Sequence, residues 1–495
     1  MSGPPNWPPP GGGPAGPAYP RTVAVGAEAS PRAWRPPSRF VVACEAVPAS
    51  SARAVIVVAM LSGAIVVGSP LGLGLSLVLL ALGVIVARVK RPAAVPTEDL
   101  RSGAAPDVRD RWTRVWWALA AGLALVPVLR AAGWVVVPCV FVAIAAASLA
   151  AADGRRWGEL WAGLGAVWAR LPLGPILAIA GAGRGASFGP VARGAVLAGG
   201  LLLVFVPLLA SADKAFAEIL DAFAPSFDLP AVRAVVIAGF VMLGGALLFV
   251  AVAPFRPRPL EVRRTLGRAE WALPLGALVV LLGGFVLLQF ATLFAGERHV
   301  LDTAGLTYAE YARSGFAQLI VVSALTLAVI AAAGRWARDG GTLLRVLLAA
   351  LCLLTLVVLA SALKRLGLYE EAYGFTRLRF AAHAILLWLG ALFVLVLIAR
   401  GAQWLPRAAL TVTLASFLAF AFADPDRRIA EWNVDRFQRT DMIDAPYLGN
   451  LSADAVPALK GMRCVPDVPD ANGLAGLNVG RAQARAAGIP PKPCR

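Results

Sequence analysis

Four short strings of the sequence combine carboxylates, arginines and aromatic residues. They are SADKAFAEILD at 211–221, GERHVLDTAGLTYAEYARSGF at 296–316, LYEEAYGFTRLRF at 368–380 and DPDRRIAEWNVDRF at 424–437. Arginine pairs with carboxylates through two parallel hydrogen bonds and also stacks on aromatic rings. The strings therefore predict either a polar cap held together by ion pairs or a ligand or acid/base site built from the same groups.

The string at 368–380 runs into a long apolar segment that carries His383. On a helix, His383 lies one turn and about 6 Å below Arg379. Ionisable groups drawn toward hydrocarbon need partners, so we expect Arg377, Arg379 and His383 to meet carboxylates from other strings. The leading candidates for these carboxylates are Asp213, Glu310 and Asp424.

Plainer interpretations stand beside this one. Glu310 and Arg313 are three residues apart and can form a structural pair on one helix face. One carboxylate or carbonyl also suffices for a lone histidine such as His383. The candidate ligand-binding cluster consists of Asp213, Glu310, Arg313, Arg377, Arg379, His383 and Asp424.

Most familiar catalytic motifs do not occur in the sequence. There is no HExxH and no GxxxxGK[ST], and the GxSxG spacing of GASFG at 185–189 lies in a Gly-rich stretch without the preceding strand that a nucleophile elbow requires. The second histidine, His299, lies beside Glu297 and Asp302, but this spacing matches no known zinc site. We therefore predict neither a metal nor a cofactor, and the sequence leaves the catalytic residues, and whether the protein is an enzyme, unknown.

Composition predicts the elements that carry the strings. The chain is 59% hydrophobic and 15% charged, with a mean hydropathy of +0.72. So much apolar surface requires lipid, which a helix crosses with about 20 apolar residues. The predicted fold is an all-α, polytopic integral membrane helical bundle of about 11 transmembrane helices. The spans lie near 54–67, 71–87, 115–129, 134–151, 194–210, 234–254, 271–294, 316–334, 343–363, 380–399 and 405–418.

The chain divides into three parts. Residues 1–52, with PPNWPPP and GGGPAGP, have the composition of a disordered cytoplasmic tail. Residues 53–422 form the transmembrane helical domain, and residues 423–495 a small extracytoplasmic tail. Within the domain, the spaced tryptophans and flanking arginines near 156–183 predict a helix lying in the membrane interface.

Lys and Arg in the loops predict the orientation. The loops on one side of the eleven spans carry 27 basic residues, and the loops on the other side carry nine. Cytoplasmic loops carry the excess of Lys and Arg, so the amino terminus is expected inside and the carboxy terminus outside.

The net charge of +17 does not indicate nucleic acid binding, because basic residues are spread over many short loops. The lipid bilayer is the expected partner.

Two cysteines, Cys464 and Cys494, fall in the predicted outer tail. Oxidising conditions outside the cell permit a bridge between them. We predict this disulfide, which would close a loop of about thirty residues.

Several motifs also carry a family resemblance. GLTYAEYARSGF at 305–316, AYGFTRLRF at 372–380, DPDRRIAEWNVDRF at 424–437 and APYLGNLSADAVPAL at 445–459 occur in this order, with ADKAF at 212–216 upstream. Together they resemble the bacterial membrane family named domain of unknown function 4173, related to the 4153 group. The resemblance implies a multi-pass protein of the bacterial cell membrane and assigns no catalytic residue. The sequence departs from that family at Asp424, where asparagine is expected, and at Glu431-Trp432, where more basic residues are usual.

Three functions are compatible with these features. The preferred one is a non-enzymatic membrane module whose extracytoplasmic polar cap binds a small ligand or an envelope or membrane protein partner. The second is a transporter or channel-like permease. The span centres contain no Asp, Glu, Lys or Arg, so no ionisable group there could couple transport to protons or ions. The third is a membrane-embedded enzyme acting on lipid-linked or envelope substrates at the outer interface, with Asp213, Glu310 or His383 as acid or base. A closed cap favours the module, and a cavity below Arg379 with access to lipid favours the enzyme.

Overall fold

The computed structural model of the chain describes residues 46–89, 111–182, 229–255, 257, 266–294, 316–337, 341–470 and 473–492. Within these ranges the regular structure is helical, apart from an isolated bridge between Val465 and Lys492. The helices up to residue 182 are α2 (Ala49–Ile65), α3 (Leu73–Arg88), α4 (Arg111–Ala124), α5 (Val126–Leu129), α6 (Gly133–Ala152), α7 (Trp157–Arg170), η1 (Leu171–Leu173) and α8 (Gly174–Ala182). The later ones in the bundle are α11 (Leu229–Val252), α12 (Arg268–Phe294), α15 (Phe316–Trp336), α16 (Gly341–Tyr373), α17 (Arg377–Ala399) and α18 (Leu405–Phe422). The rest are α19 (Pro425–Thr440), α20 (Ala445–Gly449), η2 (Ala453–Ala458), η3 (Leu474–Gly476) and α21 (Val479–Ala486).

The length and composition of these helices suit a bilayer. In the described ranges, 9 helices are long and apolar enough to cross a membrane, and α2 and α3 are shorter apolar helices. Ten of the eleven predicted spans coincide with these helices, and the one near 194–210 lies outside the described residues. The prediction of an all-α polytopic membrane bundle is confirmed.

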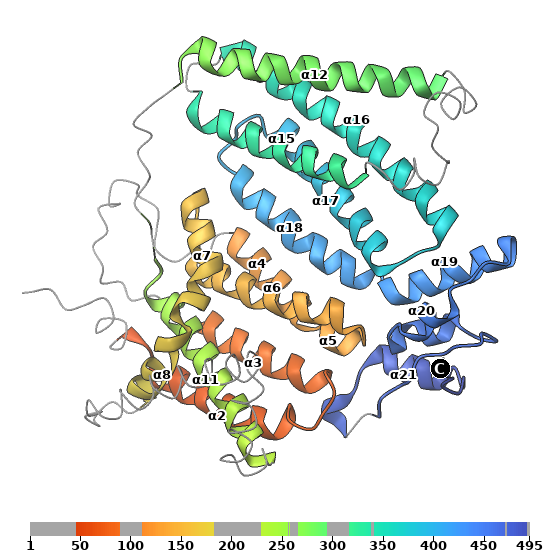
Figure 1. The fold of residues 1–495 in the computed structure, drawn as a ribbon. Helices are drawn as coiled ribbons and strands as arrows, with labels where there is room; N and C mark the ends of the chain where they lie inside the picture. Colours follow the sequence, from red (N-terminus) through yellow and green to blue (C-terminus); the bar gives the residue numbers. More distant parts are fainter. Residues whose placement is uncertain are drawn as a thin grey trace, which may run out of the picture.

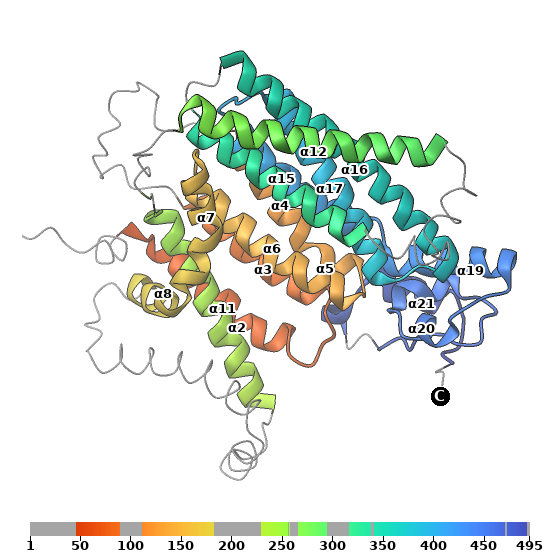
Figure 2. The ribbon, with the colours of Figure 1, turned by 45° about the horizontal axis from the view of Figure 1, so that its top comes forward.

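The carboxy-terminal helices gather at one end of the bundle, as Figures 1 and 2 show for α19, α20 and α21. We call residues 424–492, as far as they are described, the cap. Three loops at this end bond to it: Leu73 N donates to Leu477 O, Ala132 N to Asp454, and Phe375 N to Asn433. The predicted order of the eleven spans placed these three loops on one side of the membrane, and they lie at one end of the bundle.

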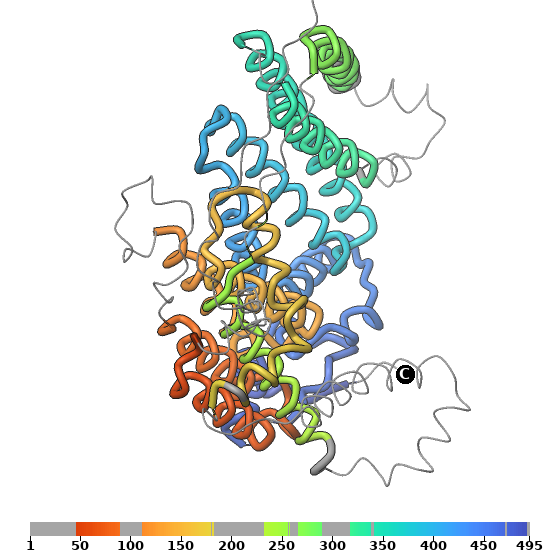
Figure 3. The backbone as a smooth tube through the Cα atoms, turned by 90° about the vertical axis from the view of Figure 1, so that its left-hand side faces the viewer, coloured from red at the N-terminus to blue at the C-terminus, as the bar shows by residue number. Residues whose placement is uncertain are grey.

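The two largest hydrophobic cores of the bundle lie in different groups of helices. One lies mainly among α2, α3, α4, α6, α7, α8 and α11, the other among α12, α15, α16 and α17, and a smaller one lies between α4–α6 and the end of α18. Figure 3 separates the two largest, with the red and orange helices at one extreme and the green and teal helices at the other. Helix α18 joins the two groups, because it packs on α17 as well as on α4 and α6.

Helices α7 and α8 lie where the interfacial segment near 156–183 is predicted. By length and hydropathy, Trp157–Ile179 is sufficient to cross a membrane. Its contacts, however, keep both of its ends at the end of the bundle opposite the cap. Helix α7 follows directly on the last turn of α6, and Arg53, near the start of α2, donates to Ala182 O. Figure 1 shows α7 running across the direction of α6.

Candidate functional site

The turn between α16 and α17 positions the first candidate residues. Helix α16 runs for 33 residues and carries Glu370 beyond its most apolar part. The chain then reverses at Gly374, whose φ of 81° lies in the left-handed region that favours glycine. Thr376 caps α17 by accepting a hydrogen bond from Arg379 N. This reversal places the first turns of α17 beside the last turns of α16.

An imidazole–carboxylate pair results from this reversal. His383 Nδ1 lies 3.2 Å from Glu370 Oε1, with the histidine side chain 33% exposed and the glutamate side chain 3% exposed. In a neutral imidazole, an Nδ1–H bonded to a carboxylate leaves Nε2 as the acceptor. The pair therefore has the composition of an oriented acid/base group.

The pair borders a cavity of about 700 Å³ between the turns of α16, α17, α18 and α19 that lie nearest the cap. This volume falls in the range of about 300–1,000 Å³ typical of small-molecule sites. Its principal lining residues are Glu370, Phe375, Phe380, His383, Ala384, Leu387, Trp388, Ser416, Phe420, Trp432, Asp435 and Arg439.

Aromatic rings form one wall of the cavity. The ring of Trp432 on α19 lies 5.0 Å from that of Phe375 and 5.8 Å from that of Phe380. The ring of Phe380 in turn lies 5.7 Å from that of Phe420 on α18. Such packing binds three helices together and presents ring surface to the cavity.

The mouth of the cavity has a polar side and an apolar side. Asp435 and Arg439 are exposed on α19, on the cap side. Leu387 on α17 is 62% exposed and lies within an apolar helix long enough to span a bilayer. The cavity is thus bordered both by charged groups and by surface suited to lipid.

A second group of charges lies close by, but it is closed. Arg377 donates to both oxygens of Asp426, at 2.9 and 2.6 Å. The side chain of Asp426 is fully buried and also accepts from Trp134 Nε1 at 2.9 Å and from Ser452 N at 2.8 Å. Arg377 further stacks over the Trp134 ring at 5.8 Å. We call these four residues the closed network.

Electrostatics agree with the geometry of the closed network. Burial acts to raise the pKa of Asp426, but the hydrogen bond and positive charge of Arg377 outweigh it, with help from Ser452 and Trp134. The pKa of Asp426 is therefore lowered, and its carboxylate stays charged.

Asp424 and Asp454 tie the cap to the loop between α5 and α6. Arg130 bonds to Asp424 Oδ2 at 2.8 Å and also donates to Ala421 O. Asp454 accepts from the backbone N–H groups of Ala131 and Ala132. These contacts join helices that are about three hundred residues apart in sequence.

These two carboxyls are less well compensated than Asp426. Burial, followed by repulsion from Asp454, raises the pKa of Asp424 to about 6, against the opposing attraction of Arg130. Its Oδ1 is buried and has no hydrogen-bond partner among the described residues. Burial also raises the pKa of Asp454, although hydrogen bonds from Ala132 and Ala131 oppose the shift.

The structure brings four of the seven predicted site residues to this end, with partners that differ from those expected. Arg377 meets Asp426 and not Asp424, because Asp424 pairs with Arg130. His383 meets Glu370 of its own string, because the turn at Gly374 folds that string back on itself. Arg379 donates to Gly374 O and stacks over Tyr369 at 4.1 Å. Asp213, Glu310 and Arg313 lie outside the described residues.

Sequence analysis did not single out the residues that complete these contacts, namely Glu370, Asp426, Asp454 and Arg130. Glu370 and Asp426 stand inside the quoted strings, so treating every carboxylate of each string as a candidate would have included them. Arg130 and Asp454 gave no such signal, since their partners are distant in sequence.

Cys464 is disulfide-bonded. Its predicted partner Cys494 lies outside the described residues, so the pairing stays a prediction. The two cysteines within spans, Cys139 and Cys352, are buried and free.

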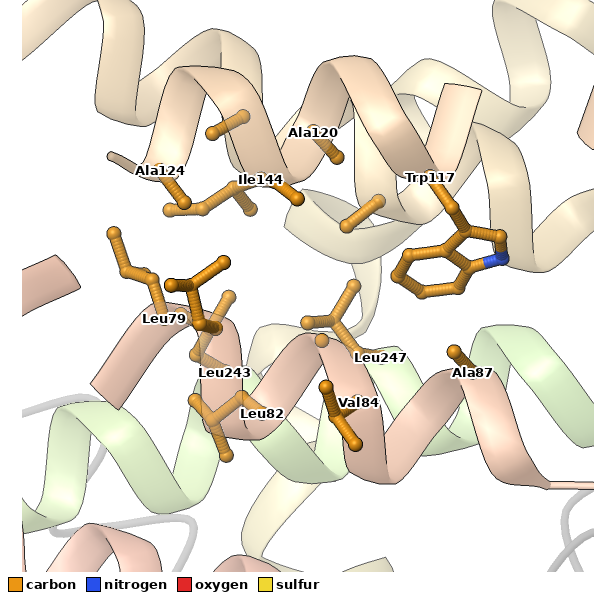
Figure 4. Close-up of a pocket in the computed structure, with 15 residues that line it drawn as sticks. Leu79, Leu82, Val84, Ala87, Trp117, Ala120, Ala124, Ile144, Leu243 and Leu247 are labelled. Carbon is orange, nitrogen blue, oxygen red and sulfur yellow. The ribbon is translucent and has the colours of Figure 1, made fainter. Parts of the chain in front are cut away.

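A second, smaller cavity of about 170 Å³ lies among α3, α4, α6 and α11. Figure 4 shows Leu79, Leu82, Leu243 and Leu247 pointing toward Ala120 and Ile144, with Trp117 at one side. Apart from the indole of Trp117 its lining is apolar, so this cavity offers a ligand no charged group.

Comparison with known proteins places the chain in a family. Residues 117–462, more than two thirds of the sequence, match the family described as domain of unknown function (DUF4153). No curated protein and no solved structure matches the chain. The resemblance to family 4173 named a related but different family and is corrected by this match. The chain, a multi-span membrane protein, belongs to the DUF4153 family.

Proposed function

We propose that the protein is a membrane-embedded binding module that holds a small amphipathic ligand in the cavity among α16–α19. The observation that carries this proposal is the lining of the cavity. The Glu370–His383 pair, in which the glutamate is buried, lies beside an aromatic wall, and the exposed Leu387 borders the same space. A mostly apolar cavity with few polar groups is the usual form of a small-molecule site.

The rest of the cap supports the same assignment. The closed network saturates Asp426 with donors, so these charges serve to hold the cap on the bundle. By contrast, the side chain of Glu370 has His383 as its one polar partner among the described residues. A buried carboxylate with unused acceptor capacity is the more suitable group for a ligand.

Orientation follows from the excess of basic residues in the loops at the end opposite the cap. We place the cap and the cavity outside the plasma membrane of a bacterium, and residues 1–52 inside. Helices α7 and α8 then lie in the inner interface, where the exposed rings of Trp157, Trp161 and Trp168 fit the preference of tryptophan for that depth.

Filling the cavity tests the proposal. Ala384→Phe places a ring in the cavity, and Ala391→Phe places one on the exposed face of the same helix. Full-length protein in maltoside detergent is titrated with dodecyldimethylamine N-oxide, and binding is followed by native mass spectrometry. We expect saturable binding that weakens at least about tenfold in Ala384→Phe only. Absence of saturable binding, or equal loss in both variants, contradicts the proposal.

An enzyme acting on a lipid-linked substrate is the second candidate. The Glu370–His383 pair favours it, because a carboxylate bonded to Nδ1 orients an imidazole for proton transfer at Nε2. In this function His383 is the acid or base, and Glu370 is a positioning residue.

The two candidates differ in what the cavity retains. If the protein is an enzyme, native mass spectrometry of protein from its own membranes should find different ligand masses on wild type and on His383→Gln. The variant then retains uncleaved or unmodified substrate. Identical masses on both proteins support the binding module and count against catalysis.

A further inference from the structure

We infer that the cavity selects an amphiphile with an ammonium head, a conclusion that rests on the proposed function and names its ligand class. The first argument is charge. The most buried ionisable group of the lining, Glu370, is 2% exposed, and its partner His383 adds no formal charge when neutral. At the mouth, Asp435 and the exposed Arg439 offset each other. With His383 neutral, the formal charge of the lining is therefore −1, and it lies on Glu370.

The second argument is the aromatic lining. Five rings border the cavity. Four of them form a row in which the centroids of neighbouring rings lie 5.0 to 5.8 Å apart, in the order Phe375, Trp432, Phe380 and Phe420. Ring faces attract a cation through their quadrupole, most strongly when water is excluded. An anionic head would meet both the ring faces and Glu370 unfavourably.

The third argument is the exit for an apolar tail. Leu387 borders the cavity and is 62% exposed on the outer surface of α17. Within a bilayer this surface meets hydrocarbon, so an alkyl chain can leave the cavity there without entering water. A bound amphiphile would therefore place its head near Glu370 and its tail past Leu387.

Matched dodecyl amphiphiles test the head preference. Full-length protein in maltoside detergent is titrated at pH 8 with dodecyltrimethylammonium, dodecyldimethylamine N-oxide and dodecyl sulfate, which share one chain. We expect the ammonium compound to bind at least about tenfold more tightly than the N-oxide, and the sulfate to bind most weakly. Equal affinity for all three heads overturns this inference and leaves the proposed function standing. Failure of all three to bind overturns both.

Substitutions assign the preference to its residues. Glu370→Gln should lower ammonium affinity about tenfold and leave N-oxide affinity nearly unchanged, whereas Glu371→Gln, an exposed neighbour, should change neither. Trp432→Leu, at a residue 37% exposed, provides a second variant should Glu370→Gln fold poorly. It should also reduce ammonium binding selectively. Parallel losses for all heads in both variants overturn the assignment.

Competition distinguishes the source of the head. Displacement of dodecyltrimethylammonium by tetramethylammonium, which has no long alkyl chain, indicates a water-borne amine; it supports the preference for an ammonium head and overturns the argument for a tail. Displacement only by amines that carry a chain indicates an amine-headed lipid. Displacement by sodium at the same ionic strength shows unspecific screening and overturns the inference.

Discussion

Two groups of charges at the cap end of α17 differ in how completely they are paired. In the closed network, Asp426 is fully buried and meets Arg377, Trp134 and Ser452. At the cavity, Glu370 on α16 is almost as buried, but it meets only His383 of α17 among the described residues. Similar residue types therefore serve two purposes. Saturated charges fix the cap to the bundle, and an unsaturated one leaves capacity for a ligand.

The largest expected effect comes from breaking the closed network. Asp426→Asn removes the fully buried charge that holds the hydrogen bonds from Arg377, Trp134 and Ser452, so the free energy of unfolding should fall by about 4 kcal/mol. Denaturant unfolding of the detergent-solubilised protein measures the change. Asp435→Asn, on the exposed face of the same helix, is the control and should change stability little. A loss below about 1 kcal/mol would show that the network does not hold the cap.

The next effect is a dependence of stability on pH through Asp424. Its pKa is raised from 3.8 to about 6 in the folded protein, so the folded state binds the proton more tightly than the unfolded state. Its stabilisation is complete below about pH 4 and is lost as pH rises through about 6, amounting to about 3 kcal/mol. Asp454, with its raised pKa, acts in the same direction.

Asp424→Asn tests this dependence. Asparagine tolerates the left-handed φ of 53° at this position and cannot titrate. Unfolding free energies measured between pH 4 and 7.5 should fall less steeply with rising pH in the variant than in wild type. Equal slopes in the two proteins would refute the role of Asp424.

A smaller change in stability is expected at the cavity. Glu370→Gln and His383→Gln should each alter the free energy of unfolding by about 1 kcal/mol, because His383 is 33% exposed and water can compensate it. The same denaturant series measures both variants. Losses as large as that of Asp426→Asn would remove the contrast between the two groups and make the pair structural.

Orientation can be tested without altering stability. Single cysteines replace Leu474, 78% exposed in the cap, and Arg345, exposed near the opposite end. A membrane-impermeant thiol reagent should modify Leu474→Cys in intact cells and Arg345→Cys only after permeabilisation. The reverse pattern would place the cap and its cavity inside.

Sequence alone determined the all-α membrane bundle, because apolar runs of span length leave helices as the way to satisfy backbone groups in lipid. It also indicated that Arg377, Arg379, His383 and Asp424 lie toward the same end of the spans, since charges beside apolar spans stand out in composition. The segment near 156–183 was likewise marked by its tryptophans. Such signals are local, and each can be read within one turn or one span.

Tertiary structure decided which charges meet. The reversal at Gly374 joins His383 to Glu370, and the docking of the cap joins Asp424 to Arg130 across 294 positions. It also pairs Arg377 with Asp426, which lies two residues from the predicted partner Asp424. Ion pairing depends on distances of a few ångströms between separate helices, and residue spacing along one helix does not fix them. Whether a buried carboxylate is saturated or open therefore follows from packing and not from the string that contains it.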